Sequence, residues 1–477
     1  MKPNLIGGAW VEGGEAAENI NPSDTDDVIG IYAQAGRAET EQAIAAAEAA
    51  FTDWSVSPVQ QRHDILRHIG DAILARCDEI AEMLAREEGK ILSEARAETE
   101  RAGRIFLFFA GEALRLTGEV MPSVRPGVGV EITREPVGPV GLITPWNFPI
   151  AIPAWKIAPA LCHGNTVVFK PAELVPGTAW LLAEIIAGSG LPAGVFNLVM
   201  GVGRVVGQTM LDTRALRAIS FTGSQATGQL VAEACLRHQR KFQLEMGGKN
   251  PLVVLDDADL ELATDVALDG AFFSTGQRCT ASSRLIVTDD IHARFVEQLT
   301  EKLRTLTVGH ALDPASKMGP VVDQVQLEQD LDFIAGARRD GANLRAGGAL
   351  VQCRTRGFFL APTLFTDTDP AMRINREEVF GPVATVIRAR DYDHALMLAN
   401  DTPFGLTAGI CTRSLKFSQH FKRYAQAGMV MVNLPTAGVD YHVPFGGAKG
   451  SSFGPREQGR HAAEFFTTVK TAYTRSY

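Results

Sequence analysis

Short apolar segments alternate with helical segments along residues 140–237, and this alternation limits the fold more than any other feature of the chain. The apolar segments have the length of strands, and the stretches between them have the spacing of helices. We predict strands at 140–144, 166–169, 194–199 and 218–221, and helices near 151–162, 176–188, 203–211 and 224–237. A second set follows Pro251, with strands at 252–255 and 285–287 and helices ending near 274 and spanning 290–305. Alternation at this spacing predicts parallel, doubly wound α/β sheets.

The flanking regions follow other patterns. Residues 38–115 are rich in Ala, Glu and Arg, and their apolar residues predict three or four helices broken near Pro58 and Gly89. Residues 120–138 combine Pro and Gly with short Val and Ile runs, which predicts hairpin strands projecting from the body. Residues 464–473 alternate like an exposed strand.

Composition argues against several classes of protein. The chain of 477 residues has room for two or three domains, and its net charge of −9 disfavours nucleic acid as a partner. No segment approaches the roughly 20 continuous apolar residues of a membrane span, and the N-terminus lacks the apolar segment of a secretory signal. The six cysteines lie far apart, which predicts reduced thiols in a cytoplasmic protein, with neither a disulfide framework nor a metal site.

Cys279 is the strongest candidate for a reactive group. Its neighbours are small or polar and Arg278 places a cation beside it, whereas the alternative is an inert, half-buried thiol. Glu245 follows the strand-like residues 242–244 and precedes two glycines; the alternative for this carboxylate is a charged residue entering a turn. A thiol and a carboxylate together predict covalent catalysis with an acid–base partner.

Polar residues also follow several predicted strands, where α/β sheets place their ligands. Asn147 has the amide to stabilise a developing oxyanion, or else it caps the next helix. Lys170 and Glu173 either hold the two hydroxyls of a ribose or form a solvated ion pair. Gly223 and Ser224 open a helix whose backbone N–H groups are suited to pyrophosphate.

Two further segments carry weaker signals. The glycines at 201, 203 and 207 have the spacing Gly-x-Gly-x-x-x-Gly, which departs from the usual Gly-x-Gly-x-x-Gly dinucleotide fingerprint. Glu378 and Phe380 place a carboxylate and an aromatic ring where a ribose and a flat ring would fit, or else they belong to a turn.

Taken in order, the motifs identify a family resemblance. They are Pro-Trp-Asn-Phe-Pro (145–149), Lys-Pro-Ala-Glu (170–173), Phe-Thr-Gly-Ser (221–224), Leu-Glu-Met-Gly-Gly-Lys-Asn (244–250), Gly-Gln-x-Cys (276–279), Glu-Glu-Val-Phe-Gly-Pro (377–382) and Pro-Phe-Gly-Gly (444–447). From about residue 5 to residue 475 the chain resembles the NAD(P)-dependent aldehyde dehydrogenase superfamily. The resemblance implies an α/β fold of two doubly wound Rossmann-like domains, for cofactor and catalysis, plus a β oligomerisation arm.

That fold implies a division of the chain. The dinucleotide-binding domain would comprise residues 1–122 and 140–246, and the catalytic domain residues 247–455. The arm would comprise residues 123–139 and 456–477, and the expected assembly is a homodimer or a homotetramer.

The resemblance also implies roles for matching residues. Cys279 would be the nucleophile that forms a thiohemiacetal and then a thioester, and Glu245 would activate the hydrolytic water. Asn147 and the Cys279 backbone N–H would form the oxyanion hole. The residues implied in cofactor binding are Thr144, Trp146, Lys170, Glu173, Gly203, Gly207, Phe221, Gly223, Ser224, Glu378 and Phe380. Of the two dinucleotides, Glu173 favours NAD over NADP because a carboxylate repels a 2′-phosphate, although Lys170 would soften this preference.

Finer detail resembles the α-ketoglutaric semialdehyde (2,5-dioxopentanoate) dehydrogenases, which implies a short aldehyde with a distal carboxylate. Arg278 is the candidate cation for that carboxylate, with a structural ion pair as the alternative. Succinic semialdehyde enzymes have arginines where this chain has Trp155 and Phe273, which disfavours that substrate. The predicted substrate-binding residues are Arg278, Phe148, Trp155, Phe273, Val439 and Tyr441.

Other functions stay open at this stage. They are oxidation of another semialdehyde or of a broad range of aldehydes, a CoA-acylating dehydrogenase, a thiol esterase without a redox role, and a protein that keeps the fold without catalysis. Glu245 favours hydrolysis of the thioester over its transfer to CoA, because transfer needs no water activator.

Overall fold

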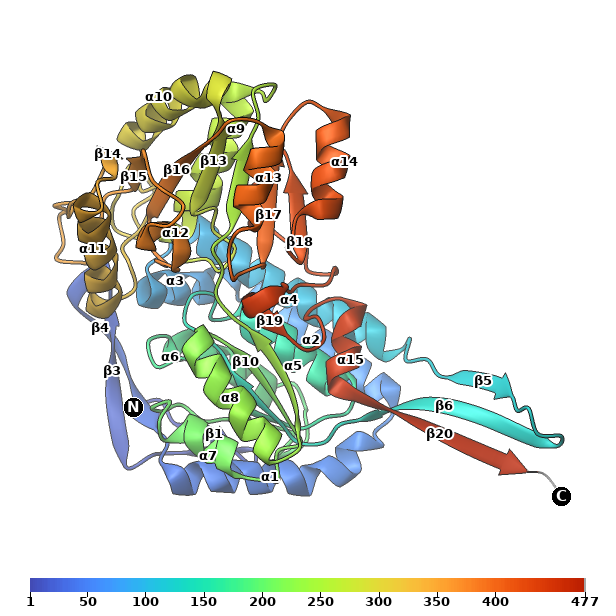
Figure 1. Cartoon of the computed structure of the whole chain (residues 1–477). Coiled ribbons are helices and arrows are strands. Elements are labelled where there is room, and N and C mark those ends of the chain that lie inside the picture. Colours follow the sequence, from blue (N-terminus) through green and yellow to red (C-terminus); the bar gives the residue numbers. More distant parts are fainter. Residues whose placement is uncertain (476–477) are drawn as a thin grey trace.

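The computed structural model describes residues 1–475 and consists of two α/β bodies and a slender extension (Figure 1). Each body is built around one large, mostly parallel sheet, and the extension is a separate three-stranded sheet. The predicted doubly wound α/β fold is therefore confirmed.

The first body contains the sheet β19-β11-β10-β7-β8-β9-β1-β2, in which β11 to β9 run parallel. The order reverses around β7, because β8 and β9 lie on one side of it and β10 and β11 on the other. The strands are β1 Asn4–Ile6, β2 Ala9–Val11, β7 Val140–Ile143, β8 Val167–Lys170, β9 Phe196–Leu198, β10 Ala218–Thr222, β11 Lys241–Glu245 and β19 Ser452–Phe453. The helices between them are α5 Ala151–Cys162, α6 Pro176–Ala187, α7 Val206–Asp212 and α8 Gln225–Arg237. Such a reversal is where doubly wound sheets bind their ligands, at the strands' carboxyl ends.

Four helices lie in the chain between β2 and β7, within the predicted three or four. They are α1 Arg37–Ser55, α2 Val59–Ala75, α3 Cys77–Glu88 and α4 Leu92–Ala113. The predicted breaks are confirmed: Pro58 is the N-cap of α2, and Gly89 ends α3 with a left-handed φ of 95°. The hairpin β3 Glu15–Asn21 and β4 Asp24–Gln34 had no counterpart in the predictions.

The second body contains the sheet β14-β15-β16-β13-β12-β17-β18, which is parallel except for the edge strand β14. Its strands are β12 Pro251–Val254, β13 Arg284–Thr288, β14 Asn343–Ala346, β15 Thr363–Thr366, β16 Val383–Ala389, β17 Thr407–Cys411 and β18 Met429–Val432. Its helices are α9 Leu260–Phe272, α10 Asp289–Thr305, α11 Gln324–Arg339, α12 Arg373–Arg376, α13 Tyr392–Asn400 and α14 Leu415–Tyr424. This sheet is also wound in both directions from its first strand, β12.

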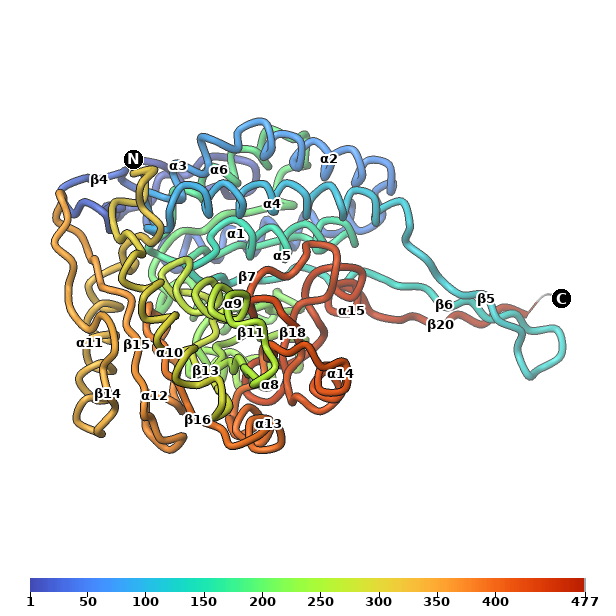
Figure 2. The backbone as a smooth tube through the Cα atoms, turned by 90° about the horizontal axis from the view of Figure 1, so that it is seen from above, coloured from blue at the N-terminus to red at the C-terminus, as the bar shows by residue number. Residues whose placement is uncertain are grey.

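The extension is the sheet β20-β6-β5, formed by β5 Glu119–Pro122, β6 Val128–Pro136 and β20 Thr467–Arg475. β20 follows the short helix α15 Ala463–Phe466, and Figure 2 shows the sheet projecting far beyond the body. The predicted hairpin strands and the predicted terminal strand are thus confirmed. β5 lies outside the boundaries predicted for the arm, and residues 476–477 of that prediction lie outside the described residues.

Three observations concern the chain as a whole. Across residues 1–475, every helix is too short or too polar to cross a membrane. In the same residues no group of three or more His, Cys, Asp or Glu side chains is placed to hold a metal ion. All six cysteines are unpaired.

Candidate active site

The candidate site lies where the carboxyl ends of the first sheet meet the amino ends of the second. Asn147 follows β7, and Lys170 and Glu245 are the last residues of β8 and β11. On the other side, Cys279 precedes β13 and Glu378 precedes β16. Hydrogen bonds cross this seam, because the Asn147 amide donates to the Gln277 carbonyl at 2.9 Å and the Gly248 N–H donates to Glu378 at 2.8 Å. The two edges therefore form one site.

The turn that leads to Cys279 is held in an unusual backbone conformation. Ser274, Thr275 and Gly276 all have left-handed φ values, of 51°, 56° and 66°. Side chains rarely adopt this region, and such strain persists where the surroundings enforce it, often at active sites. Gly276 also has no room for a side chain, because a Cβ there would lie 2.2 Å from the Gly381 carbonyl oxygen. The geometry before Cys279 is fixed by packing.

The Cys279 backbone is anchored from the segment that joins the two sheets. The Asn250 amide donates to the carbonyls of Cys279 and Ala281, at 2.7 Å and 3.0 Å. This leaves the half-buried thiol at the wall of a cavity of about 310 Å³. Asn250 was quoted within a motif but given no role in the sequence predictions.

The surroundings of the thiol favour its protonated form. Burial raises the pKa of Cys279, and the carboxylates of Glu378 and Glu245 raise it further. Arg278 does not offset this, because its guanidinium donates to the backbone carbonyl of Asp269 and lies 3.2 Å from the carboxylate of that residue. Activation of Cys279 therefore needs a base, and the adjacent cation does not supply the activation that the sequence suggested.

Glu245 is a buried carboxyl group suited to that role. Burial raises its pKa well above the usual range, with a further contribution from the charge of Glu457, and Ser452 donates to it at 2.6 Å. Lys156 contacts Glu457 and donates to Ser220 at 2.7 Å. A carboxyl group with a raised pKa can accept a proton near neutral pH. Lys156 carried a signal that went unused, since it is the single charged residue in the apolar helix α5.

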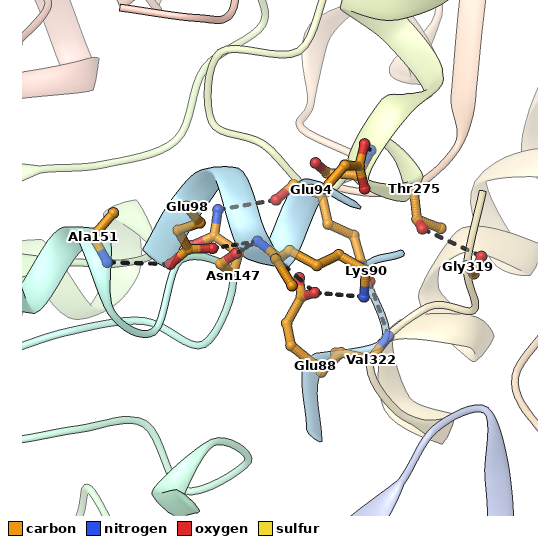
Figure 3. Close-up of polar contacts among 12 residues, drawn as sticks. Glu88, Lys90, Glu94, Glu98, Asn147, Ala151, Thr275, Gly319 and Val322 are labelled. Atoms are coloured by element: carbon orange, nitrogen blue, oxygen red, sulfur yellow. Dashed lines mark hydrogen bonds and ion pairs between the residues drawn. The ribbon is translucent and has the colours of Figure 1, made fainter. Parts of the chain in front are cut away.

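A buried ionic network holds the backbone of Asn147 in place (Figure 3). Lys90 donates to the Asn147 carbonyl at 2.6 Å and to the carboxylate of Glu98 at 2.7 Å. The other oxygen of Glu98 accepts the N–H groups of Ile150 and Ala151, both at 3.1 Å. Glu98 thus serves the N-terminus of α5, and the Asn147 side chain is free of the capping role that was its alternative. Neither Lys90 nor Glu98 was predicted.

Lys170 and Glu173 form the candidate ribose site. Lys170 is buried rather than solvated, donates to the Pro171 carbonyl at 2.9 Å and lies 4.0 Å from Glu173. Burial lowers its pKa to about 8. Glu173 accepts the Gly203 N–H at 2.6 Å. A Cβ on Gly203 would contact both Glu173 and Lys170, and a Cβ on Gly207 would contact Lys170. The four residues therefore lie together at the end of β8, with Lys170 buried and Glu173 partly exposed.

The start of α8 forms the next part of the candidate cofactor site. Ser224 caps this helix by accepting the Thr227 N–H at 3.3 Å, and the first turn of α8 directly follows the carboxyl end of β10. A Cβ on Gly223 would strike the Phe221 ring at 2.6 Å. The hydroxyls of Thr144 and Thr222, at the ends of β7 and β10, are buried and have no partner within residues 1–475. Unpaired donors at a helix N-terminus fit an anionic dinucleotide.

Trp146 and Phe380 meet across the seam, with ring centroids 5.3 Å apart in an edge-to-face arrangement. Phe380 has a left-handed φ of 65°. Burial raises the pKa of the neighbouring Glu378 to about 7. Glu378 and Glu245 are the two carboxyl groups whose charges raise the pKa of Cys279 most. They come from opposite edges of the seam.

The cavity beside Cys279 brings together most of the residues predicted to bind substrate. Phe148, Trp155, Phe273, Arg278 and Val439 line it. Tyr441 is not among the lining residues of the described chain, and its ring packs edge-on against Phe108 at 6.5 Å. The wall also includes Arg101 of α4, which the sequence predictions missed.

Comparison with known proteins gives a consistent result. The model of the aldehyde dehydrogenase family matches residues 10–472. An α-ketoglutaric semialdehyde dehydrogenase of Bacillus subtilis is 42% identical, over 99% of this chain and 98% of its own. A 2,5-dioxopentanoate dehydrogenase of Saccharolobus solfataricus is 40% identical, over 97% of each chain. Among solved structures, betaine aldehyde dehydrogenase of Staphylococcus aureus in complex with NAD+ is similar, with a TM-score of 0.97, 34% identity and coverage of 100% of this chain and 95% of its own.

Proposed function

Because this chain belongs to the aldehyde dehydrogenase family, we propose that it oxidises a short aldehyde with a distal carboxylate, such as 2,5-dioxopentanoate, to the corresponding acid. Two findings support this substrate. Relatives at 40% and 42% identity carry that activity in their names, and the cavity beside Cys279 contains two arginines. The coarser function, oxidation of aldehydes with NAD(P)+, follows from the family.

In this proposal Cys279 attacks the aldehyde carbon and forms a thiohemiacetal. The Cys279 proton passes to a base, for which Glu245 is suited because its pKa is raised. The Asn147 amide and the Cys279 N–H stabilise the developing oxyanion, and Lys90 keeps the Asn147 backbone in place. A bound nicotinamide dinucleotide would accept a hydride from the thiohemiacetal, which would thereby become a thioester. Glu245 then releases the proton of Cys279 to solvent and, as a carboxylate, takes a proton from the water that attacks the thioester. That proton passes to the departing Cys279 sulfur, so the acid is released and the thiol is restored.

The carboxyl ends of the strands of the first sheet form the proposed cofactor site, and its features fit a dinucleotide. Lys170 and Glu173 would hold the adenosine ribose, and the start of α8 at Gly223 and Ser224 would meet the pyrophosphate. Glu378 and Phe380 would adjoin the nicotinamide riboside. We expect NAD to be preferred, because the Glu173 carboxylate repels a 2′-phosphate.

We propose that the extension of β5, β6 and β20 joins copies of the chain into a dimer or a tetramer. The support is its surface, which exposes large apolar side chains such as Val120, Val469 and Tyr473. The six unpaired cysteines support a cytoplasmic location.

The substrate proposal is tested by NADH formation with a panel of aldehydes. We expect kcat/KM for 2,5-dioxopentanoate to exceed that for pentanal, its neutral counterpart, by about 100-fold or more, which corresponds to one strong charge-assisted contact. Succinic semialdehyde, which is one carbon shorter and lacks the 2-oxo group, should fall between them. Equal or higher kcat/KM for pentanal, or for the cationic betaine aldehyde, would contradict the proposal.

A further inference from the structure

Three buried hydrogen-bond donors lie in the wall of the cavity beside Cys279 or directly behind it, and nothing in residues 1–475 satisfies them. The Nε of Arg101, the Nε1 of Trp155 and the Nε2 of Gln458 are all buried, and within residues 1–475 none has an acceptor. Buried polar groups are almost always paired, since an unpaired one costs about 1–3 kcal/mol. All three atoms are hydrogen-bond donors, so the partner that they lack is a hydrogen-bond acceptor.

The three residues form one cluster although they come from distant parts of the sequence. Arg101 lies on α4 and Trp155 on α5, and both line the cavity with Cys279. Arg101 donates through its Nη2 to the side-chain oxygen of Gln458 at 3.0 Å, and its guanidinium carbon is 5.7 Å from the centroid of the Trp155 ring. The Trp155 ring is held by stacking on Phe445 at 5.2 Å.

Gln458 is itself in an unusual position. It is fully buried and has a left-handed φ of 59°, a conformation that costs energy for a residue other than glycine. The fold holds the Gln458 side chain against Arg101 despite that cost. Its amide nitrogen is left without an acceptor.

The charges around the cavity do not account for Arg101. Glu98 is occupied by Lys90 and two backbone N–H groups, and Asp269 is paired with Arg278. Glu94 accepts the Ser274 N–H at 2.8 Å, and burial raises its pKa. Burial lowers the pKa of Arg101, and the charges of Glu98 and Asp440 offset this only in part. Within residues 1–475 neither carboxylate forms an ion pair with the Arg101 guanidinium. A largely buried guanidinium without a carboxylate is costly unless a ligand provides one.

We propose that Arg101, with Trp155 and Gln458, binds the distal carboxylate of the aldehyde and makes the enzyme selective for anionic substrates. This rests on the proposed function and assigns its recognition step to a residue that the sequence predictions missed. The 2-oxo acid end of 2,5-dioxopentanoate offers three acceptor oxygens, which complement the donors of this cluster. Arg278 also lines the cavity, and its Nε is likewise buried without an acceptor within residues 1–475. Its guanidinium is engaged by Asp269, however, so it is the weaker candidate for the same role.

The test compares Arg101→Met with Arg101→Lys and with Arg104→Met, an exposed arginine on the same helix. Each variant is assayed with 2,5-dioxopentanoate, 5-oxopentanoate and pentanal, after its melting temperature has been checked. For Arg101→Met we expect kcat/KM for the two anionic aldehydes to fall on the order of 100-fold, mostly through KM. The loss for pentanal should be at least tenfold smaller. Arg101→Lys should retain part of the selectivity because it keeps the charge but not the planar donors, and Arg104→Met should resemble the wild type.

A second measurement does not need turnover. The product 2-oxoglutarate should protect Cys279 of the wild type and of Arg104→Met against alkylation by iodoacetamide, and it should protect Arg101→Met at only much higher concentration. Equal losses for anionic and neutral aldehydes in Arg101→Met, with unchanged protection, would overturn the role of Arg101 and leave the proposed substrate standing. A wild type that does not prefer anionic aldehydes would instead overturn the substrate, and the role of Arg101 with it.

Discussion

The two sheets contribute to the site from opposite ends of their strands. The first sheet places Asn147, Lys170 and Glu245 at strand carboxyl ends, whereas the second places Cys279 and Glu378 just before strand amino ends. The first arrangement follows the general rule for ligand binding by α/β sheets. The second does not follow it and depends on the strained turn at 274–276 and the Asn250 anchor. Cofactor binding thus uses a common property of the fold, whereas the nucleophile depends on local features of this sequence.

The largest effect should come from the nucleophile on the second edge. Cys279→Ser should lower NADH formation by roughly 10⁴-fold or more, because the less acidic hydroxyl has no comparable means of activation. Cys353→Ser, at another partly exposed thiol, serves as the control and should retain wild-type activity. Activity of Cys279→Ser within tenfold of the wild type would show that the second edge does not carry the chemistry.

The next largest effect should come from the network that joins the two edges. Lys90→Met leaves the buried carboxylates of Glu88 and Glu98 uncompensated, which costs about 3 kcal/mol or more. We expect the melting temperature to fall by at least about 5 °C and kcat to fall with it, since Asn147 loses its support. Lys302→Met, which breaks a surface pair with Glu261 and Asp265, should have little effect on either. An unchanged melting temperature for Lys90→Met would mean that the strand ends alone hold the seam.

A smaller effect is expected at the first edge, and it should concern the cofactor alone. Glu173→Gln removes the negative charge beside the ribose site, so the ratio of kcat/KM for NAD to that for NADP should fall about tenfold. The exposed Glu48→Gln of α1 is a matched control for the loss of one charge. The comparison would fail if Glu173→Gln altered the aldehyde preference and not the cofactor preference.

The smallest effect should depend on pH and on the second edge. The Glu378 carboxylate raises the pKa of Cys279, and its own pKa is about 7, so this influence is present above pH 7 and lost below it. Glu378→Gln should therefore speed alkylation of Cys279 by iodoacetamide a few-fold at pH 8.5 and have almost no effect at pH 5.5. Glu377→Gln, at an exposed carboxylate paired with Arg373, should match the wild type at both pH values. A rate ratio for Glu378→Gln that is independent of pH would contradict this account.

The contrast between the edges also explains what the sequence could reveal. Strand–helix alternation and polar residues at strand ends predict β7 to β11 of the first sheet and the helices α5 to α8, and the structure confirms these elements within a few residues. The strands β1, β2 and β19 of the same sheet were not predicted. At the second sheet, Cys279 was singled out by its small or polar neighbours and by Arg278, and the family resemblance then supplied its role. Its place before a strand carries no positional signal like that of a residue at a strand's carboxyl end. The hairpin of β3 and β4 escaped prediction because its alternation is partial and most of β3 is exposed.

The residues around the substrate were the hardest to foresee. Arg101, Gln458 and Lys90 come together from segments far apart in the chain, and contacts of this kind depend on tertiary packing. One signal was available at Arg101, which shares a helix face with Glu98 and Ile105, both buried. A cation on the buried face of a helix requires a partner, and that requirement could have been recognised from the sequence.

The crowding at Gly276 has a practical consequence for attempts to change which aldehyde is accepted. A Cβ there would lie 2.2 Å from the Gly381 carbonyl oxygen, so Gly276 cannot be replaced without moving the turn that leads to the nucleophile. The cavity is also lined by side chains of α4 and α5, and apart from Glu94 and Glu98, which bind backbone N–H groups, these can be exchanged with less disturbance to the backbone. A mutant library aimed at new substrates should therefore vary those side chains and leave residues 274–276 as they are.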